Sequence, residues 1–145
     1  MSSLKKLLKE KGYKKIKLTF TATNHLEIKA KINDIEGNFI LDTGASSSCV
    51  GFEAISHFKL LAEESDVKAA GAGATNMLTQ IAQKNNIEIK GWKKKKIDFV
   101  LFDLTHINDA LVNHKADKVH GIIGADILKK GKAVIDYKSE SLFLK

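Results

Sequence analysis

The chain has 145 residues, of which 43% are hydrophobic and 28% are charged. This length and composition are typical of one globular domain with a buried core. No apolar stretch is long enough to cross a membrane, and the charged N-terminus lacks the apolar run of a secretory signal. The single cysteine, Cys49, excludes an internal disulfide framework, and we therefore expect a reducing, cytoplasmic setting.

The net charge is +7, from 24 basic and 17 acidic residues, and lysines cluster at residues 5–17 and 93–96. A basic patch of this kind is compatible with nucleic-acid binding. However, arginine is absent, whereas proteins that read nucleic acids usually combine arginine with aromatic side chains. We therefore interpret the lysines as solvated surface residues and expect neither a nucleic-acid nor a membrane partner.

The apolar pattern predicts an N-terminal helix followed by many short strands. Leu4, Leu7 and Leu8 share one face of a helix over residues 2–11. Alternating apolar residues predict strands at 16–20, 26–32, 35–41, 46–50, 77–83, 87–90, 97–102, 119–123, 133–137 and 141–144. Helical turns are expected at 52–58, 105–113 and 125–130. The sequence thus predicts an all-β, barrel-like domain over residues 14–145, with a helical arm at residues 1–13.

The strongest chemical signal is the apolar run 39–41, which leads directly into Asp42-Thr43-Gly44 and then into small residues. Glycine permits a tight turn and the close approach of a second backbone. A carboxylate presented in this way suits an acid that shares a proton with another acid and activates water. Asp-Thr-Gly alone also occurs in ordinary turns, because Asp and Gly are common turn residues.

A second segment lies far downstream, where Gly121-Ile122-Ile123-Gly124 runs into Ala125-Asp126 and a short helix. Together, the two segments resemble the retropepsin-like aspartic proteases of bacterial type, which are single-domain relatives of pepsin. The resemblance extends from about residue 18 to residue 144. It implies a closed acid-protease barrel with a few short helices, and an aspartic endopeptidase that uses no cofactor.

The resemblance also assigns roles to individual residues. The catalytic acid and base is Asp42, and the turn that carries it is supported by Thr43, Gly44 and Ala45. The packing beneath that turn is assigned to Ile122, Ile123 and Gly124, and a capping or pairing role to Asp126. The flap, a hairpin that closes over substrate, is assigned to Gly71, Ala72 and Gly73, for which an ordinary glycine-rich loop is the alternative.

Only Asp42, among nine aspartates, is followed by Thr/Ser-Gly. Since the chemistry needs two carboxylates, we expect a homodimer in which Asp42 meets Asp42, acting on polypeptide substrates. Two departures from the retroviral pattern keep an alternative open. The tail continues as a hairpin over residues 132–145, and the flap lacks bulky apolar residues. The alternative is an acid-protease fold that serves as a non-catalytic binding module.

Other candidate sites are weaker. The five histidines show neither the helical spacing with Glu nor the cysteine neighbours of a metal site, so no metal is expected. Cys49 has no base near it in sequence and is expected to be a small core residue.

Overall fold

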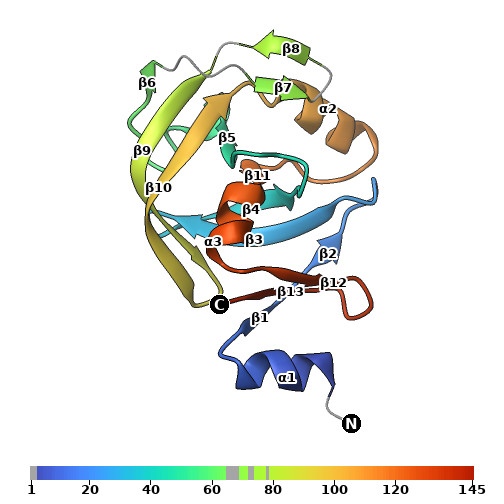
Figure 1. The fold of residues 1–145 in the computed structure, drawn as a ribbon. Helices are drawn as coiled ribbons and strands as arrows, with labels where there is room; N and C mark the ends of the chain where they lie inside the picture. The colour runs from blue at the N-terminus through green and yellow to red at the C-terminus, as the bar shows by residue number, and fades with distance from the viewer. Residues whose placement is uncertain (1–2, 65–68, 72–73, 78) are drawn as a thin grey trace.

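The computed structural model describes residues 3–64, 69–71, 74–77 and 79–145 (Figure 1). In chain order the elements are α1 (Leu4–Glu10), β1 (Lys14–Lys17), β2 (Thr19–Phe20), β3 (Leu26–Ile32), β4 (Ile35–Leu41), β5 (Cys49–Gly51), the 3-10 helix η1 (Phe52–Ala54), β6 (Glu63–Glu64), β7 (Ala69–Gly71), β8 (Ala74–Met77), β9 (Gln80–Ile89), β10 (Trp92–Phe102), α2 (Thr105–Asn113), β11 (Gly121–Ile123), α3 (Ala125–Lys130), β12 (Val134–Asp136) and β13 (Ser141–Leu144). None of the helices in these ranges is long and apolar enough to cross a membrane.

The main sheet closes on itself to form a barrel. Its strand order is β2-β3-β4-β11-β5-β10-β9-β6, and β3 also pairs with β9. The closing pairs are Lys31 with Glu88 and Ile32 with Ile87. The strands β3, β4, β11, β5, β10 and β9 therefore form a closed ring. This architecture confirms the predicted all-β class and the closed barrel with a few short helices.

The hairpin β3–β4 leads the chain to the Asp42 turn. Along β3, alternate side chains are buried, as the apolar alternation predicts. The connecting residues Asn33 and Asp34 have φ of 52° and 67°, and a two-residue hairpin turn of this type requires positive φ at both positions. The Asn33 side chain also bonds the Asn85 side chain at 3.0 Å and the Asn86 backbone N–H at 3.1 Å. The turn is thereby tied to β9.

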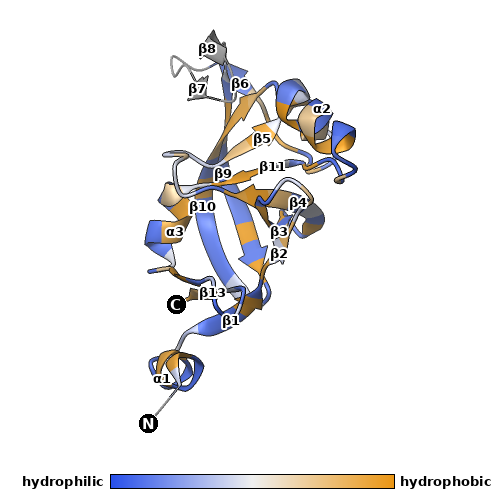
Figure 2. Ribbon diagram, turned by 90° about the vertical axis from the view of Figure 1, so that its right-hand side faces the viewer, coloured by the Kyte–Doolittle hydropathy of each residue, from blue (hydrophilic) through white to orange (hydrophobic). Residues whose placement is uncertain are grey.

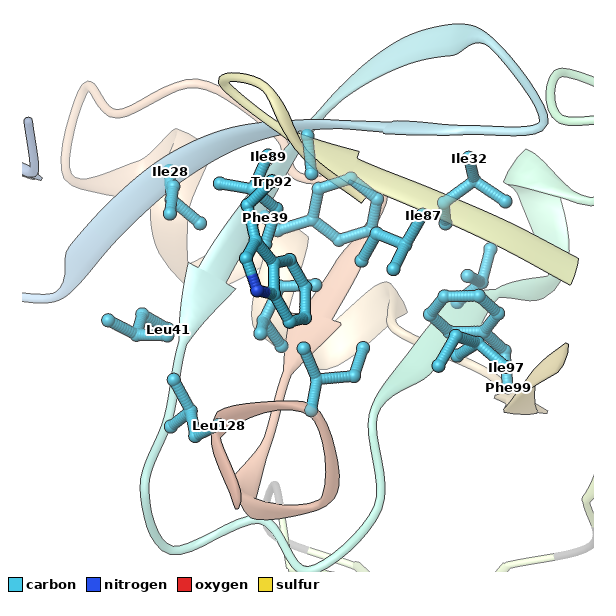
Figure 3. Packing of buried hydrophobic residues seen from close by; sticks show 14 of the residues in the cluster. Ile28, Ile32, Phe39, Leu41, Ile87, Ile89, Trp92, Ile97, Phe99 and Leu128 are labelled. Carbon is cyan, nitrogen blue, oxygen red and sulfur yellow. The ribbon is translucent and has the colours of Figure 1, made fainter. Parts of the chain in front are cut away.

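Two hydrophobic clusters lie on opposite sides of the barrel wall. The larger cluster fills the barrel, where Phe39, Ile87 and Phe99 are fully buried (Figure 3). The smaller cluster lies between the wall and α2, and it consists of Ile40, Cys49, Phe102, Leu104, Leu111, Val119 and Ile122. Both β5 and β11 are accordingly hydrophobic along their length, whereas α2 carries both kinds of residue (Figure 2). The strands that flank the Asp42 turn are packed on both faces.

The two ends of the chain meet in a separate three-stranded sheet of order β1-β13-β12. The predicted closing hairpin is present as β12 and β13. The strand expected at 16–20 is wrong as a single unit, because β1 pairs with β13 while β2 pairs with β3. Next to this sheet, α1 lies at the opposite end of the molecule from β7 and β8 (Figure 1). It buries Leu8, and the Tyr13 hydroxyl donates to the Lys132 carbonyl at 2.9 Å.

The prediction of two strands at 77–83 and 87–90 is also wrong, because Gln80–Ile89 is one strand, β9. Its polar centre resembles a turn in sequence. In the structure Lys84 adopts φ 59° next to register shifts in the β9–β10 pairing, and its N–H donates to Asp98 at 3.0 Å. The buried Asn85 side chain bonds the Ala82 carbonyl. The polar residues thus form a bulge within the ladder instead of ending it.

The predicted first residues of several strands differ from the observed ones, whereas the predicted helices agree with the structure. The strand expected from residue 46 begins at Cys49, and the strand expected from residue 119 begins at Gly121. The strand expected at 97–102 begins earlier, at Trp92. The helices expected at 105–113 and 125–130 are confirmed as α2 and α3, and the turns expected at 52–58 contain η1.

Candidate active site

The Asp42 turn begins where β4 ends, and its position is set by β11. Leu41 pairs with Ile123 in the parallel β4–β11 ladder. One residue further, the Asp42 backbone N–H donates to the Ile123 carbonyl at 3.0 Å. Asp42, Thr43 and Gly44 are all exposed to solvent, although the last three residues of the strand that delivers them are buried. A rigid strand thus presents a carboxylate at the surface.

The carboxylate is oriented by its own turn. The Gly44 backbone N–H donates to the Asp42 carboxylate oxygen Oδ1 at 2.9 Å, and the Ala45 N–H donates to the Asp42 carbonyl at 3.2 Å. A Cβ on residue 44 would lie 3.3 Å from that same Oδ1. A side chain at residue 44 would therefore crowd the same carboxylate oxygen that the Gly44 N–H holds.

The segment after β11 packs directly beneath the turn. The residues predicted to support it, Ile122, Ile123 and Gly124, are all buried. The Ala125 N–H donates to the Ala45 carbonyl at 2.7 Å, and a Cβ on Gly124 would lie 2.5 Å from that carbonyl oxygen. Since real Cβ contacts are not that short, residue 124 has to be glycine for the two segments to approach this closely. The structure thus brings together the two segments that were singled out in the sequence.

Asp126 is engaged in hydrogen bonds within the fold. Its Oδ1 accepts from the Ser48 N–H at 2.9 Å, from the Ser48 hydroxyl at 2.7 Å and from the Ile127 N–H at 2.8 Å. The predicted capping or pairing role stays a proposal that these contacts support. Ser48 was not predicted as a site residue. It is fully buried, and its hydroxyl also accepts from the Gly124 N–H at 2.8 Å.

The predicted flap is only partly described. Gly71 ends β7, which pairs antiparallel with β8 through Gly71 with Ala74 and Ala69 with Met77. Ala72 and Gly73 lie outside the described residues. The two strands lie at the end of the molecule remote from α1, above β9 and β10 in Figure 1. Two antiparallel strands therefore border the positions at which the sequence predicts a flap, and the flap itself stays a prediction.

Cys49 is a buried residue with a free thiol. Burial raises the pKa of the Cys49 thiol to about 12, and the charges of Asp126 and Asp42 act in the same direction. The thiol is therefore protonated at neutral pH and lies in the smaller hydrophobic cluster. In the described part of the chain, no group of three or more His, Cys, Asp or Glu residues is arranged to hold a metal ion.

A histidine pair lies on the outside of the barrel near the start of β11. The rings of His57 and His120 are stacked, with centroids 4.6 Å apart. The Asn38 backbone N–H donates to His120 Nδ1 at 3.0 Å, and His57 Nε2 donates to the Glu36 carbonyl at 2.8 Å. Burial lowers the pKa of His120, and the neighbouring His57 lowers it further. These contacts hold β4 against the residue that precedes β11.

A closed barrel with an Asp-Thr-Gly turn supported by an Ile-Ile-Gly strand defines the acid-protease class of folds. Residues 28–127 match the sequence model of an aspartyl protease family. The chain belongs to this family of retropepsin-like aspartic proteases, as the sequence resemblance indicated. No curated protein sequence matches the chain.

Solved structures support the same fold. A retropepsin-like aspartic protease from Rickettsia conorii aligns with a TM-score of 0.59 and 20% identity, covering 91% of this chain and 90% of that one. The EIAV protease in complex with the inhibitor HBY-793 aligns with a TM-score of 0.55 and 24% identity, covering 77% of this chain and 91% of that one. The retroviral protease-like domain of Ddi1 from Leishmania major aligns with a TM-score of 0.58 and 16% identity, covering 83% of this chain and 88% of that one. At these identities the likeness concerns the fold.

Proposed function

We propose that the protein is an aspartic endopeptidase that hydrolyses peptide bonds with two Asp42 carboxylates, one from each copy in a homodimer. The observation that carries this proposal is the exposed Asp42 carboxylate, which Gly44 orients at the end of a buried strand. The chain contains no second Asp-Thr/Ser-Gly sequence. The other half of a symmetric dyad must therefore come from a second molecule.

The neighbouring acid, Asp126, is poorly suited to be the second member of the dyad within one chain. Three donors already occupy its Oδ1, and two of them come from the fully buried Ser48. A two-fold axis next to the exposed Asp42-Thr43-Gly44 turn supplies a better partner. On that axis, Thr43 would link the two turns through its hydroxyl, and Gly44 would allow the backbones to approach.

In this mechanism the two Asp42 carboxyl groups share one proton, because two like charges in contact cannot both be retained. The ionised carboxylate takes a proton from water, whose oxygen attacks the peptide carbonyl carbon. The protonated carboxyl gives its proton to the carbonyl oxygen, which produces a gem-diol. On collapse, one carboxylate takes a proton from the diol while the other carboxyl protonates the leaving nitrogen. The C–N bond breaks, and the dyad again holds one proton.

The substrate is proposed to be an extended polypeptide that binds between the Asp42 turns and the β7–β8 hairpin. Gly71, Ala72 and Gly73 would then contribute to the flap that covers it. Carboxylates and water supply the chemistry, so we propose no cofactor. We also propose a cytoplasmic setting, which the lone, buried Cys49 favours.

The domain organisation is proposed to be an arm of residues 1–13 and a catalytic domain of residues 14–145. The arm contains α1, which contacts the rest of the chain through buried Leu8. The catalytic domain starts with β1, which already belongs to a sheet with β13 and β12.

One observation favours a second function. The terminal strands β1, β12 and β13 pair with each other inside one chain, whereas retroviral members of the family use their termini to build the dimer. A monomer that uses the acid-protease fold to bind a partner is the alternative. Sedimentation with and without an unfolded polypeptide separates the two functions, since a strict monomer at high concentration supports the binding module.

The proposed activity is tested by incubating the protein with unfolded polypeptides from mildly acidic to neutral pH. Wild-type protein should generate fragments, and Asp42→Asn should generate none. The oxygen of Asn still accepts from Gly44 N–H, so the turn should be retained. Cleavage that persists in the Asp42→Asn variant would contradict the assignment.

A further inference from the structure

We propose that Ser48 is a positioning residue, whose buried hydroxyl holds the 42–48 loop in the geometry that aims Asp42; this inference rests on the proposed function. Ser48 lies at the end of that loop, just before β5. It is one of the few buried polar residues of the described chain, with 0% exposure. Its hydroxyl does not face water, so its hydrogen bonds are part of the fold.

The Ser48 hydroxyl is both a hydrogen-bond donor and a hydrogen-bond acceptor. It donates to Asp126 Oδ1 at 2.7 Å and accepts from the Gly124 N–H at 2.8 Å. Gly124 and Asp126 lie on either side of Ala125, whose N–H holds the Ala45 carbonyl. The Ser48 backbone adds two contacts, since its N–H also donates to Asp126 and its carbonyl accepts from the Val100 N–H of β10 at 3.1 Å. Ser48 thus joins the loop, β10 and the start of α3.

The loop is therefore fixed at three points along its length. Asp42 is held by Ile123 at the start, Ala45 by Ala125 in the middle, and Ser48 by Gly124 and Asp126 at the end. The first two attachments use backbone atoms, which every sequence supplies. Only the third requires a particular side chain on the loop, and it is the one that substitution can remove.

Removing the hydroxyl would leave the Gly124 N–H without its acceptor in a buried place. An unpaired buried polar group is costly, so the segment would shift to reach water or another acceptor. Ala125 follows Gly124 directly and holds Ala45, which in turn bonds the Asp42 carbonyl. A shift of this segment therefore reaches the Asp42 backbone, and with it the base of the carboxylate side chain, through two hydrogen bonds. Displacement of a reacting group by about 1 Å can cost on the order of 100-fold in rate.

The test compares Ser48→Ala with Ser48→Thr and with Ser141→Ala. Thr keeps the hydroxyl and both of its hydrogen bonds. Ser141 is the matched control, because it is also a fully buried serine whose hydroxyl bonds a carbonyl, that of Ser139, in the terminal sheet. Ser48→Ala is expected to lower kcat by about 10- to 100-fold with little change in KM. Ser48→Thr should restore most of kcat, and Ser141→Ala should retain it.

A general loss of stability would lower the activity of both alanine variants alike, and that outcome would overturn the proposal. So would a Ser48→Ala enzyme with unchanged kcat. Measuring Asp42→Asn alongside them shows whether the cleavage is due to Asp42 at all.

If the wild-type protein cleaves nothing, the proposed function fails, and the positioning role is still measurable by amide hydrogen exchange. Ser48→Ala should speed exchange at Ala45, Gly124 and Ala125 relative to Ser141→Ala, with the barrel amides unchanged. Equal exchange at these three amides in the two variants would overturn the role of Ser48.

Discussion

The Asp42 N–H donates to the Ile123 carbonyl at 3.0 Å, so the acidic turn is attached to the last residue of β11. The parallel pairing of β4 with β11 sets this contact. Both strands are buried between the two hydrophobic clusters. The position of an exposed carboxylate is thus determined by packing in the barrel wall, and variants beneath the turn should affect it without touching it.

Gly124→Ala should impair both folding and cleavage. The new Cβ would lie 2.5 Å from the Ala45 carbonyl oxygen, a backbone atom that cannot rotate away. We expect a loss of about 1–3 kcal/mol in the free energy of unfolding, as is usual for overpacking, and reduced kcat. Denaturant titration and peptide cleavage measure these two effects.

Gly51→Ala is the matched control for this substitution. Its Cβ would meet the Leu104 side chain at 3.1 Å, and a leucine side chain can adjust its rotamer. Gly51→Ala should therefore cost less stability than Gly124→Ala and should leave kcat unchanged. An equal loss in the two variants would argue against a special role for the contact between residues 124 and 45.

The stability of the protein should fall at acidic pH in part because of His120. Its pKa is lowered in the folded state by burial and by His57, whereas the unfolded chain titrates near the ordinary value of about 6.5. Between the two values the unfolded state binds more protons. The free energy of unfolding is therefore fully retained above the unfolded pKa and decreases as the pH falls below it. Protonation at Nδ1 also displaces the Asn38 N–H.

Denaturant unfolding between pH 4 and pH 8 measures this dependence. His120→Gln should make the free energy of unfolding depend less steeply on pH in that window, by a slope that corresponds to less than one proton per molecule. Parallel curves for the wild type and the His120 variant would show that His120 contributes nothing to the acid sensitivity.

Cys49 should be unreactive in the folded protein. Its thiol is 3% exposed and its pKa is raised to about 12, so little thiolate is available. Iodoacetamide at pH 8 should label the native protein far more slowly than the protein in denaturant, as read by mass spectrometry. Rapid labelling of the native state would place the thiol outside the smaller hydrophobic cluster.

Deletion of residues 1–13 tests the proposed domain boundary. The arm contributes buried Leu8 and the bond from Tyr13 to the Lys132 carbonyl. Burial of a leucine contributes about 1.5–3 kcal/mol, so the truncated protein should be less stable by up to about that amount. Its barrel should remain folded by circular dichroism. Global unfolding of the truncated chain would assign the arm to the core domain.

Local patterns predicted much of this fold from the sequence. Asn and Asp tolerate positive φ, so the pair Asn33-Asp34 predicts the hairpin that leads to the Asp42 turn, and both residues do adopt positive φ. The helices α2 and α3 were recognised from short apolar patterns bounded by polar residues and glycine. The Asp42 turn and the Ile-Ile-Gly segment were recognised because each is a compact motif. The structure brings the two segments together.

Long-range pairing was beyond the reach of the sequence patterns. Nothing local indicates that β3 pairs with β9 to close the barrel, or that β1 leaves β2 to join β13. The buried Asn85 looked like a turn residue because its partners, Ala82 and Asn33, become visible only in the folded chain. Ser48 was missed for the same reason. Ser46, Ser47 and Ser48 look alike in sequence, and only the partners of Ser48 in the later segment distinguish it from the other two.

The central claim is that each active site needs two Asp42 residues, one from each of two molecules. Subunit mixing tests this claim most directly. Wild-type protein and a tagged Asp42→Asn variant are unfolded together in equal amounts and refolded, and cleavage is measured per wild-type chain. Random pairing leaves about half of the wild-type chains in wild-type homodimers, so activity per wild-type chain should fall to about half, and the isolated mixed dimer should be inactive. Activity that is unaffected by the variant would contradict the shared dyad.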